Sequence, residues 1–233
     1  MRGLLITATD TGVGKTILSA ALLAAMKHAG EPVRAYKPVV TGLTDPTEIL
    51  ARGAWPADHE LLALAAGMEP GEVAPLRYGP AVSPHLAAQL AGEPIDPVML
   101  VARASDARGP DAEATLIVEG VGGLLTPLAE DYSVCDLAVA LGLPVLIAAR
   151  PGLGTINHTL LTLMAARSAG LGVRAVVFTP WRAEPTEVER SNRATIARLG
   201  DVAVEGLPVV SSPAPADLAR AGSELAGALG LTG

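Results

Sequence analysis

Short, uninterrupted apolar runs alternate with longer amphipathic segments along most of this chain of 233 residues. Apolar runs of this length, without polar alternation, are typical of strands buried on both faces of a sheet. The runs predict strands at Leu4–Ala8, Val33–Tyr36, Thr115–Val118, Val145–Ala149 and Ala175–Phe178. The segments that follow predict helices at Thr16–Ala29, Asp58–Ala66, Pro97–Ala107, Val134–Leu141, Asn157–Ala169, Pro185–Leu199 and Ala216–Leu229. This order predicts an α/β fold with a doubly wound, mostly parallel sheet and helices on both faces.

The chain is predicted to form one domain over residues 1–233, because no internal repeat and no linker-like stretch divides it. A content of 50% hydrophobic and 18% charged residues excludes a disordered chain. The proline-rich stretch from Pro70 to Pro84 is interpreted as a long surface connection inside that domain.

Charge and cysteine content narrow the classes of function. A formal net charge of -7 and an aromatic content of 3% argue against nucleic-acid binding, which needs basic and stacking side chains. The longest uncharged apolar stretch, Leu137–Ala149, is shorter than the roughly 20 residues that a membrane helix needs. Cys135 is the only cysteine, so an internal disulfide is excluded and a reducing, cytoplasmic location is expected.

A candidate phosphate-binding loop lies between the first predicted strand and the first predicted helix. Residues 9–16 read Thr-Asp-Thr-Gly-Val-Gly-Lys-Thr, and backbone N–H groups of such a loop can cradle phosphate oxygens at a helix N-terminus. Lys15 is expected to reach the β- and γ-phosphates, and the Thr16 hydroxyl to bind Mg²⁺. Thr9 stands where the strict pattern has glycine, so an ordinary glycine turn before a helix is the alternative. The predicted nucleotide-binding residues here are Gly12, Val13, Gly14, Lys15, Thr16 and Ile17.

Two more charged residues end predicted strands. Lys37 follows the second strand, where a doubly wound sheet places it beside the loop, within reach of a transferred phosphate; the alternative is a surface lysine at a strand end. Glu119 ends the third strand and is followed by Gly120, Val121 and Gly122. A carboxylate at this position favours Mg²⁺, which prefers oxygen ligands; the alternative is a structural glutamate with a partner elsewhere.

These segments, taken in order with Ser83-Pro84-His85 and Gly154-Thr155-Ile156-Asn157-His158, resemble the dethiobiotin synthetase family over the chain to about Pro208. The resemblance implies a three-layer sandwich of the P-loop NTPase type and an ATP- and Mg²⁺-dependent ligase of biotin biosynthesis. In that family 7,8-diaminononanoate and CO₂ become dethiobiotin through a carbamate and a carbamic–phosphoric anhydride, with release of ADP and phosphate.

The resemblance also implies residue roles. Lys37 and Lys15 are expected to be catalytic, and the magnesium ligands to be Thr16, Glu119 and Asp58, with Asp45 as the alternative aspartate. The remaining nucleotide contacts are expected from Gly120, Val121, Gly122, Pro208, Val209 and Val210. The substrate is expected to meet Thr11 and Thr41, and its carboxylate to meet Thr155, Ile156 and Asn157 of a second subunit in a homodimer with shared active sites. Asn157 is alternatively an ordinary helix N-cap.

The chain departs from the family after the strand Ala175–Phe178. Many family members have Asn-Asp there, whereas this chain has Thr179-Pro180-Trp181. Proline has no N–H and threonine has one hydroxyl, so we expect relaxed choice of nucleobase. The Trp181 ring is expected either to stack on the base or to cover the sheet edge.

Two other classes of protein share such a loop. A partition or septum-type switch ATPase would carry a signature lysine at the position of Asp10. An amidotransferase-type synthetase acting on a corrin acid would need an attached glutaminase domain with a catalytic cysteine, and Cys135 lies in the wrong context for one.

Overall fold

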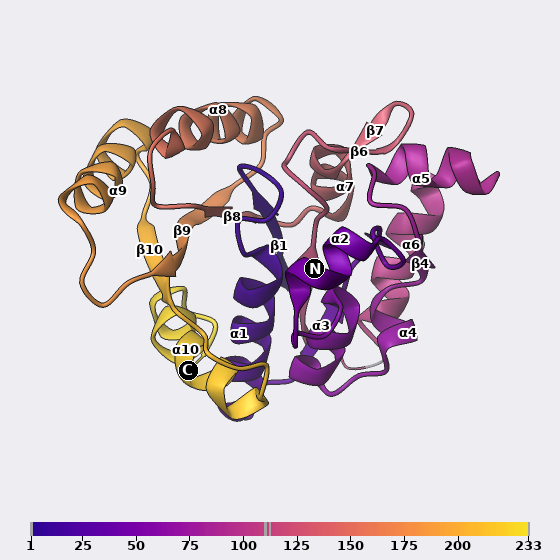
Figure 1. Ribbon diagram of the computed structural model, residues 1–233, viewed down its shortest axis with the longest axis horizontal. Coiled ribbons are helices and arrows are strands. Elements are labelled where there is room, and N and C mark those ends of the chain that lie inside the picture. The colour runs from indigo at the N-terminus through magenta and orange to yellow at the C-terminus, as the bar shows by residue number, and fades with distance from the viewer. Residues whose placement is uncertain (1, 110, 112, 233) are drawn as a thin grey trace.

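A six-stranded parallel sheet forms the centre of the computed structural model, which describes residues 2–109, 111 and 113–232 (Figure 1). Its strand order is β10-β9-β8-β1-β5-β2, and every neighbouring pair runs parallel. The strands are β1 (Gly3–Ala8), β2 (Val33–Tyr36), β5 (Thr115–Glu119), β8 (Val145–Ala149), β9 (Val173–Trp181) and β10 (Val204–Pro208). The chain therefore builds one side of β1 with β2 and β5 and then the other side with β8, β9 and β10.

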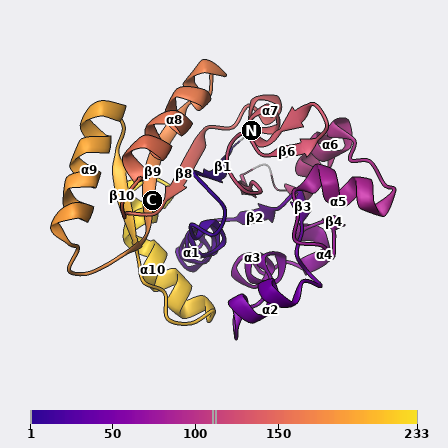
Figure 2. The same ribbon diagram turned by 45° about the horizontal axis from the view of Figure 1, so that its top comes forward.

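Helices cover both faces of this sheet (Figure 2). One face carries α1 (Lys15–His28), α3 (Asp58–Ala66) and α10 (Pro215–Ala228). The other face carries α6 (Pro97–Ala107), α7 (Val134–Leu141), α8 (Thr155–Ser168) and α9 (Glu187–Gly200). Along β1, Leu4 and Ile6 enter the first core and Leu5 the second, as the alternation of side chains in a strand requires. The predicted doubly wound α/β fold is confirmed.

Helix α1 lies between α3 and α10 and packs closely against both (Figure 2). Four of its buried residues are alanines, whose small side chains let neighbouring backbones approach. The closest approach is at Gly222 of α10, where an added Cβ would lie 2.2 Å from the backbone oxygen of Ala21. Only glycine fits at this crossing, so α10 is held directly against the helix that begins at the phosphate loop.

The shorter elements were not predicted from the sequence. They are the helices α2 (Pro46–Arg52), α4 (Pro70–Val73) and α5 (Pro84–Ala91) and the strands β3 (Val39–Val40), β4 (Leu76–Arg77), β6 (Pro127–Ala129) and β7 (Tyr132–Ser133). The interpretation of residues 70–84 as a surface connection is wrong in part, because α4 and β4 lie within it and Val73 and Ala74 are buried. Pro70 and Pro84 instead begin helices, a position where the missing N–H of proline costs nothing.

The carboxyl ends of β1, β2 and β5 lie together at one end of the sheet. After β5 the chain crosses from one side of β1 to the other, where it forms β8. In open parallel sheets, ligands bind at such a switch point. Among the residues that the structure describes, no helix is long and apolar enough to cross a membrane.

Candidate active site

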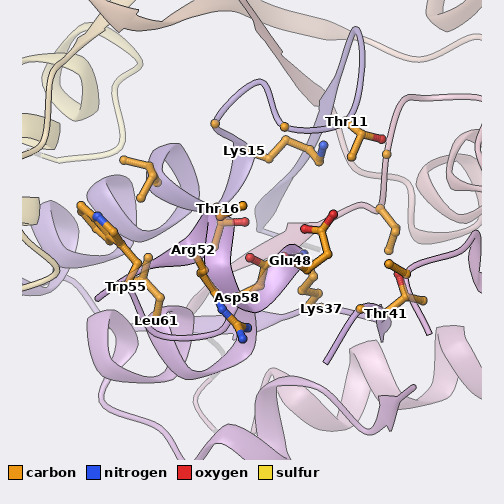
Figure 3. A pocket seen from close by; sticks show the side chains of 18 of the residues that line it. Thr11, Lys15, Thr16, Lys37, Thr41, Glu48, Arg52, Trp55, Asp58 and Leu61 are labelled. Carbon is orange, nitrogen blue, oxygen red and sulfur yellow. Dashed lines mark hydrogen bonds and ion pairs between the residues drawn. The ribbon is translucent and has the colours of Figure 1, made fainter. Parts of the chain in front are cut away.

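A cavity of about 980 Å³ opens at this end of the sheet. It is bounded by the loop between β1 and α1, the ends of β2 and β10, the first turn of α3, and α2 (Figure 3). The structure brings together most of the residues predicted from the sequence. Those lining the cavity are Thr11, Gly12, Gly14, Lys15, Thr16, Ile17, Lys37, Thr41, Asp58, Val121, Gly122, Pro208, Val209 and Val210.

The loop between β1 and α1 has a backbone that requires glycine. Gly12 has φ 68° and Gly14 has φ 98°, values that side chains disfavour. A Cβ on Gly14 would also lie 2.7 Å from the hydroxyl oxygen of Thr179. Outside the loop, the Arg150 guanidinium donates hydrogen bonds to the carbonyl oxygens of Thr11 and Gly12, at 3.2 and 3.4 Å. The loop is thereby held in one shape at the start of α1.

Lys37 lies between two carboxylates beside this loop. Its ammonium group is 2.7 Å from Oδ2 of Asp58 and 2.5 Å from Oε1 of Glu119. The Lys37 side chain is 4% exposed and that of Glu119 is fully buried, whereas Asp58 reaches the cavity. One cation and two anions therefore lie together next to the loop that would bind the phosphates.

The oxygen atoms around this cluster fit a magnesium ion. The Thr16 hydroxyl donates to Oε1 of Glu119 at 2.9 Å, and Oε2 of Glu119 is buried without a hydrogen-bond partner among the residues that the structure describes. A buried carboxylate oxygen without a partner is costly, so a ligand for it is expected. Two carboxylates and a hydroxyl suit Mg²⁺, which uses few protein ligands and keeps several waters. Within the described part of the chain, no group of three or more His, Cys, Asp or Glu residues forms a metal cluster.

Burial and charge act differently on the two lysines of the site. Burial lowers the pKa of Lys15 to about 8, although Glu119 acts in the opposite direction. Burial would also lower the pKa of Lys37, but the adjacent Asp58 and Glu119 carboxylates outweigh it and raise the pKa above its usual value. The two carboxylates thus favour the charged form of Lys37, whereas burial disfavours the charged form of Lys15.

Comparison with known proteins decides the family. The chain is 42% identical over 234 residues to the ATP-dependent dethiobiotin synthetase BioD of Anaeromyxobacter sp. (strain K), covering 99% of this chain and 98% of the relative. It is 34% identical over 209 residues to BioD of Bacillus subtilis (strain 168), covering 89% and 87%. This chain belongs to the ATP-dependent dethiobiotin synthetase family. It is therefore an ATP-dependent ligase. A family model described as "AAA domain" also matches residues 2–211.

Solved structures similar to this dethiobiotin synthetase family member support the fold. The MinC:MinD cell division protein complex of Aquifex aeolicus matches with a TM-score of 0.51 and 16% identity, covering 97% of this chain and 96% of that chain. Cobyrinic acid a,c-diamide synthase of Mycobacterium smegmatis, solved with an ATP analog and magnesium, matches with a TM-score of 0.51 and 15% identity, covering 97% and 95%. At such identities the likeness shows the fold alone, and it confirms the P-loop NTPase type.

Some site residues predicted from the synthetase family lie away from the cavity wall. Val13 is buried in the first core. Gly120 follows β5, and its N–H donates to the carbonyl oxygen of Ile6. Thr155, Ile156 and Asn157 are in the first turn of α8, outside the cavity. The N-cap of α8 is Gly154, with φ 88°, so the alternative of Asn157 as N-cap is wrong.

Asp45, the alternative metal aspartate, has a different place. It is the N-cap of α2, where its side chain accepts hydrogen bonds from the N–H groups of Thr47 and Glu48. It does not line the cavity, whereas Asp58 does. The geometry therefore favours Asp58.

Sequence reasoning missed Glu48, Arg52 and Trp55, which line the cavity from α2 and the turn after it (Figure 3). It considered Trp181 instead. The Trp181 ring lies outside this cavity, 5.7 Å from the Phe178 ring and 5.5 Å below the guanidinium of Arg193. A Cβ on Gly206 of the edge strand β10 would lie 2.5 Å from Cγ of this ring, so the position of Trp181 favours the expectation that it covers the sheet edge over stacking on a base.

Proposed function

We propose that this enzyme converts 7,8-diaminononanoate, CO₂ and MgATP to dethiobiotin, ADP and phosphate. A carbamate on one amine attacks the γ-phosphorus of ATP, and the bond between that phosphorus and ADP breaks. The second amine then attacks the carbamoyl carbon, loses its proton and expels phosphate, which closes the ring. The residues of the family resemblance and the relatives' names support this reaction.

The observation that carries the proposal is the placement of Lys37 between Asp58 and Glu119, beside the phosphate loop. Charge moves from the carbamate to the transferred phosphoryl group, so a fixed cation at this point lowers the energy of the transition state. Lys15 adds a second positive charge from the start of α1, and phosphate oxygens would favour its protonated form. Thr11 and Thr41 line the same cavity and offer hydroxyl groups to the carbamate or the amine.

Thr16, Asp58 and Glu119 would hold the magnesium ion. When bound, the ion would neutralise charge on the β- and γ-phosphates. The unpartnered Oε2 of Glu119 supports this assignment.

A homodimer with shared sites is part of the proposal. In the first turn of α8 the N–H of Thr155 donates to the carbonyl oxygen of Gly152, whereas the N–H groups of Ile156 and Asn157 have no backbone acceptor among the described residues and favour a carboxylate. Thr155, Ile156 and Asn157 do not reach the cavity of their own subunit. Exposed apolar side chains lie just before this turn and further along α8, with Leu153 99% and Met164 65% exposed. Such a surface suits a second copy of the chain. A single domain over residues 1–233, a cytoplasmic location and the absence of nucleic-acid partners also stay predictions.

Product formation tests the proposal directly. Purified protein is mixed with MgATP, bicarbonate and 7,8-diaminononanoate, each omitted in turn, and phosphate release is measured with dethiobiotin by mass spectrometry. We expect equimolar phosphate and dethiobiotin only in the complete mixture. Phosphate release that is indifferent to the diamine would instead support the switch ATPase.

A further inference from the structure

The cavity has two ends on either side of the phosphate loop. In Figure 3, Thr41 and Trp55 lie at opposite ends, with Lys15 and Thr16 between them. If the carbamate and the diamine occupy the Thr41 end, as the proposed function requires, the nucleoside of ATP extends toward Trp55. The side chains at that end then decide how the base is held.

The Trp55 end is lined mainly by apolar side chains, with Arg52 of α2 beside them. Ile17 comes from the first turn of α1, which lies between α3 and α10 (Figure 2). Leu61 of α3 lines the same end of the cavity. Val210, which follows β10, lines it as well. Ile17, Trp55 and Val210 are partly buried at the margin of one core, so each keeps an exposed surface toward the cavity. The flat face of an aromatic base fits these apolar side chains.

The backbone at Trp55 is fixed at both ends. Its N–H donates to the carbonyl oxygen of Arg52 at 3.1 Å, which closes the turn after α2. Pro56 follows and restricts Trp55 to extended backbone. Asp58, three residues on, pairs with Lys37 at 2.7 Å. The ring is therefore tied to the same helix start that contributes the acidic group of the site.

We propose that Trp55 is the residue that stacks on the nucleobase and that it does so with little regard to which base is bound. Every base has a π-face, so stacking adds affinity without discrimination. At the β9 end of the cavity, Thr179 and Pro180 line the wall, and their side chains offer a single hydroxyl to a base edge. Trp55 thus replaces affinity that polar base contacts would otherwise supply.

Tryptophan fluorescence allows a direct test, because the chain has only two tryptophans. A Trp181→Phe protein keeps a ring against Phe178 and leaves Trp55 as the sole reporter. We expect Mg²⁺ complexes of ATP, GTP and CTP to change its emission, whereas Mg²⁺-tripolyphosphate, which lacks a base, leaves it nearly unchanged. No change with any nucleotide would overturn the proposal.

Affinities then separate stacking from general disruption of the site. Calorimetry on Trp55→Ala should show Kd for ATP, GTP and CTP raised about tenfold each, from the usual strength of base–aromatic stacking. Kd for tripolyphosphate should stay the same. Trp55→Phe, which keeps a ring, should retain most of the affinity, and Trp55→Leu, which keeps only apolar volume, should not. Leu50→Ala is the matched control, because Leu50 lies on the neighbouring α2, is 82% exposed and does not line the cavity.

Two outcomes would refute this role for Trp55. Equal weakening of tripolyphosphate and ATP would mean that Trp55 supports the loop rather than the base, and tight ATP binding by Trp55→Ala would mean that the base lies elsewhere. Both measurements use nucleotide alone, without diamine. A protein that behaves as expected here but makes no dethiobiotin would refute the proposed function and leave the stacking role intact.

Discussion

Replacement of Lys37 by glutamine should separate turnover from nucleotide binding. The substitution removes the cation that lies 2.7 Å from Asp58 and 2.5 Å from Glu119 and leaves a neutral polar side chain that is one atom shorter. Loss of one preorganised charge that acts on the transition state lowers kcat by about 10²–10³-fold. Kd for MgATP should change little, because the loop and Lys15 remain to bind the phosphates.

The same variant should have a lower free energy of unfolding, and the size of the loss depends on how deeply Lys37, Asp58 and Glu119 are buried. Removing one partner of a buried ion pair costs about 3–5 kcal/mol. Glu119 is fully buried, but Asp58 is 44% exposed and can turn to water, so the lower figure applies. With an unfolding entropy of about 2.1 cal/mol/K per residue, a loss of about 3 kcal/mol lowers Tm by about 6 °C in this 233-residue chain.

The assay combines kcat at saturating diamine, calorimetric Kd for MgATP and thermal unfolding on one preparation. Lys27→Gln is the matched control, because Lys27 is exposed at the far end of α1, and it should leave all three quantities nearly unchanged. A Lys37→Gln protein with near-normal turnover would refute the catalytic assignment. An unchanged Tm would refute the account of the buried pair.

Three further predictions concern packing, assembly and base choice. Gly222→Ala should cost about 1–3 kcal/mol of stability by overpacking against the α1 backbone, whereas Gly227→Ala, with open space around it in the same helix, should be neutral or stabilising; thermal unfolding compares the two. Mixing Lys37→Gln with Asn157→Arg protein should restore part of the synthetase activity through hybrid dimers with one intact site, and no rescue after demonstrated subunit exchange would contradict shared sites. The kcat/KM values for ATP, GTP and CTP should agree within about a hundredfold, and a larger preference for ATP, on the order of 3 kcal/mol, would mean that polar groups read the adenine.

The long helices and strands could be predicted from the sequence because the apolar pattern of each agrees with the residues that begin and end it. The predicted helices Asp58–Ala66 and Val134–Leu141 match the structure at both ends, and the glycine that follows each helix as a left-handed cap accounts for the C-terminal end. The Val204–Pro208 strand was missed because β10 is an edge strand with a glycine in its middle, so it lacks a continuous apolar run.

The active site also contains residues that could be predicted from the sequence and residues that could not. Residues 9–16, Lys37 and Glu119 could be found because short segments at strand ends carry them, and parallel strands place those ends together. Trp55 and Glu48 could not be found, because α2 has no buried residue and therefore no apolar periodicity to mark it. The position of such a helix depends on tertiary contacts that no local pattern contains.

The close contact between α1 and α10 has a consequence for synthesis on the ribosome. Helix α1 is synthesised long before α10, and although α3 packs on its other side, the surface of α1 that meets α10 stays uncovered until α10 follows. Contacts between such distant parts of a chain form slowly. The helix that carries the nascent phosphate loop therefore lacks one of its two helix neighbours during most of translation, and nucleotide binding should arise only after α10 emerges, although α10 has no residue in the cavity. Ribosome-bound chains that end before α10 should be sensitive to proteases within α1 and should be recognised by chaperones there.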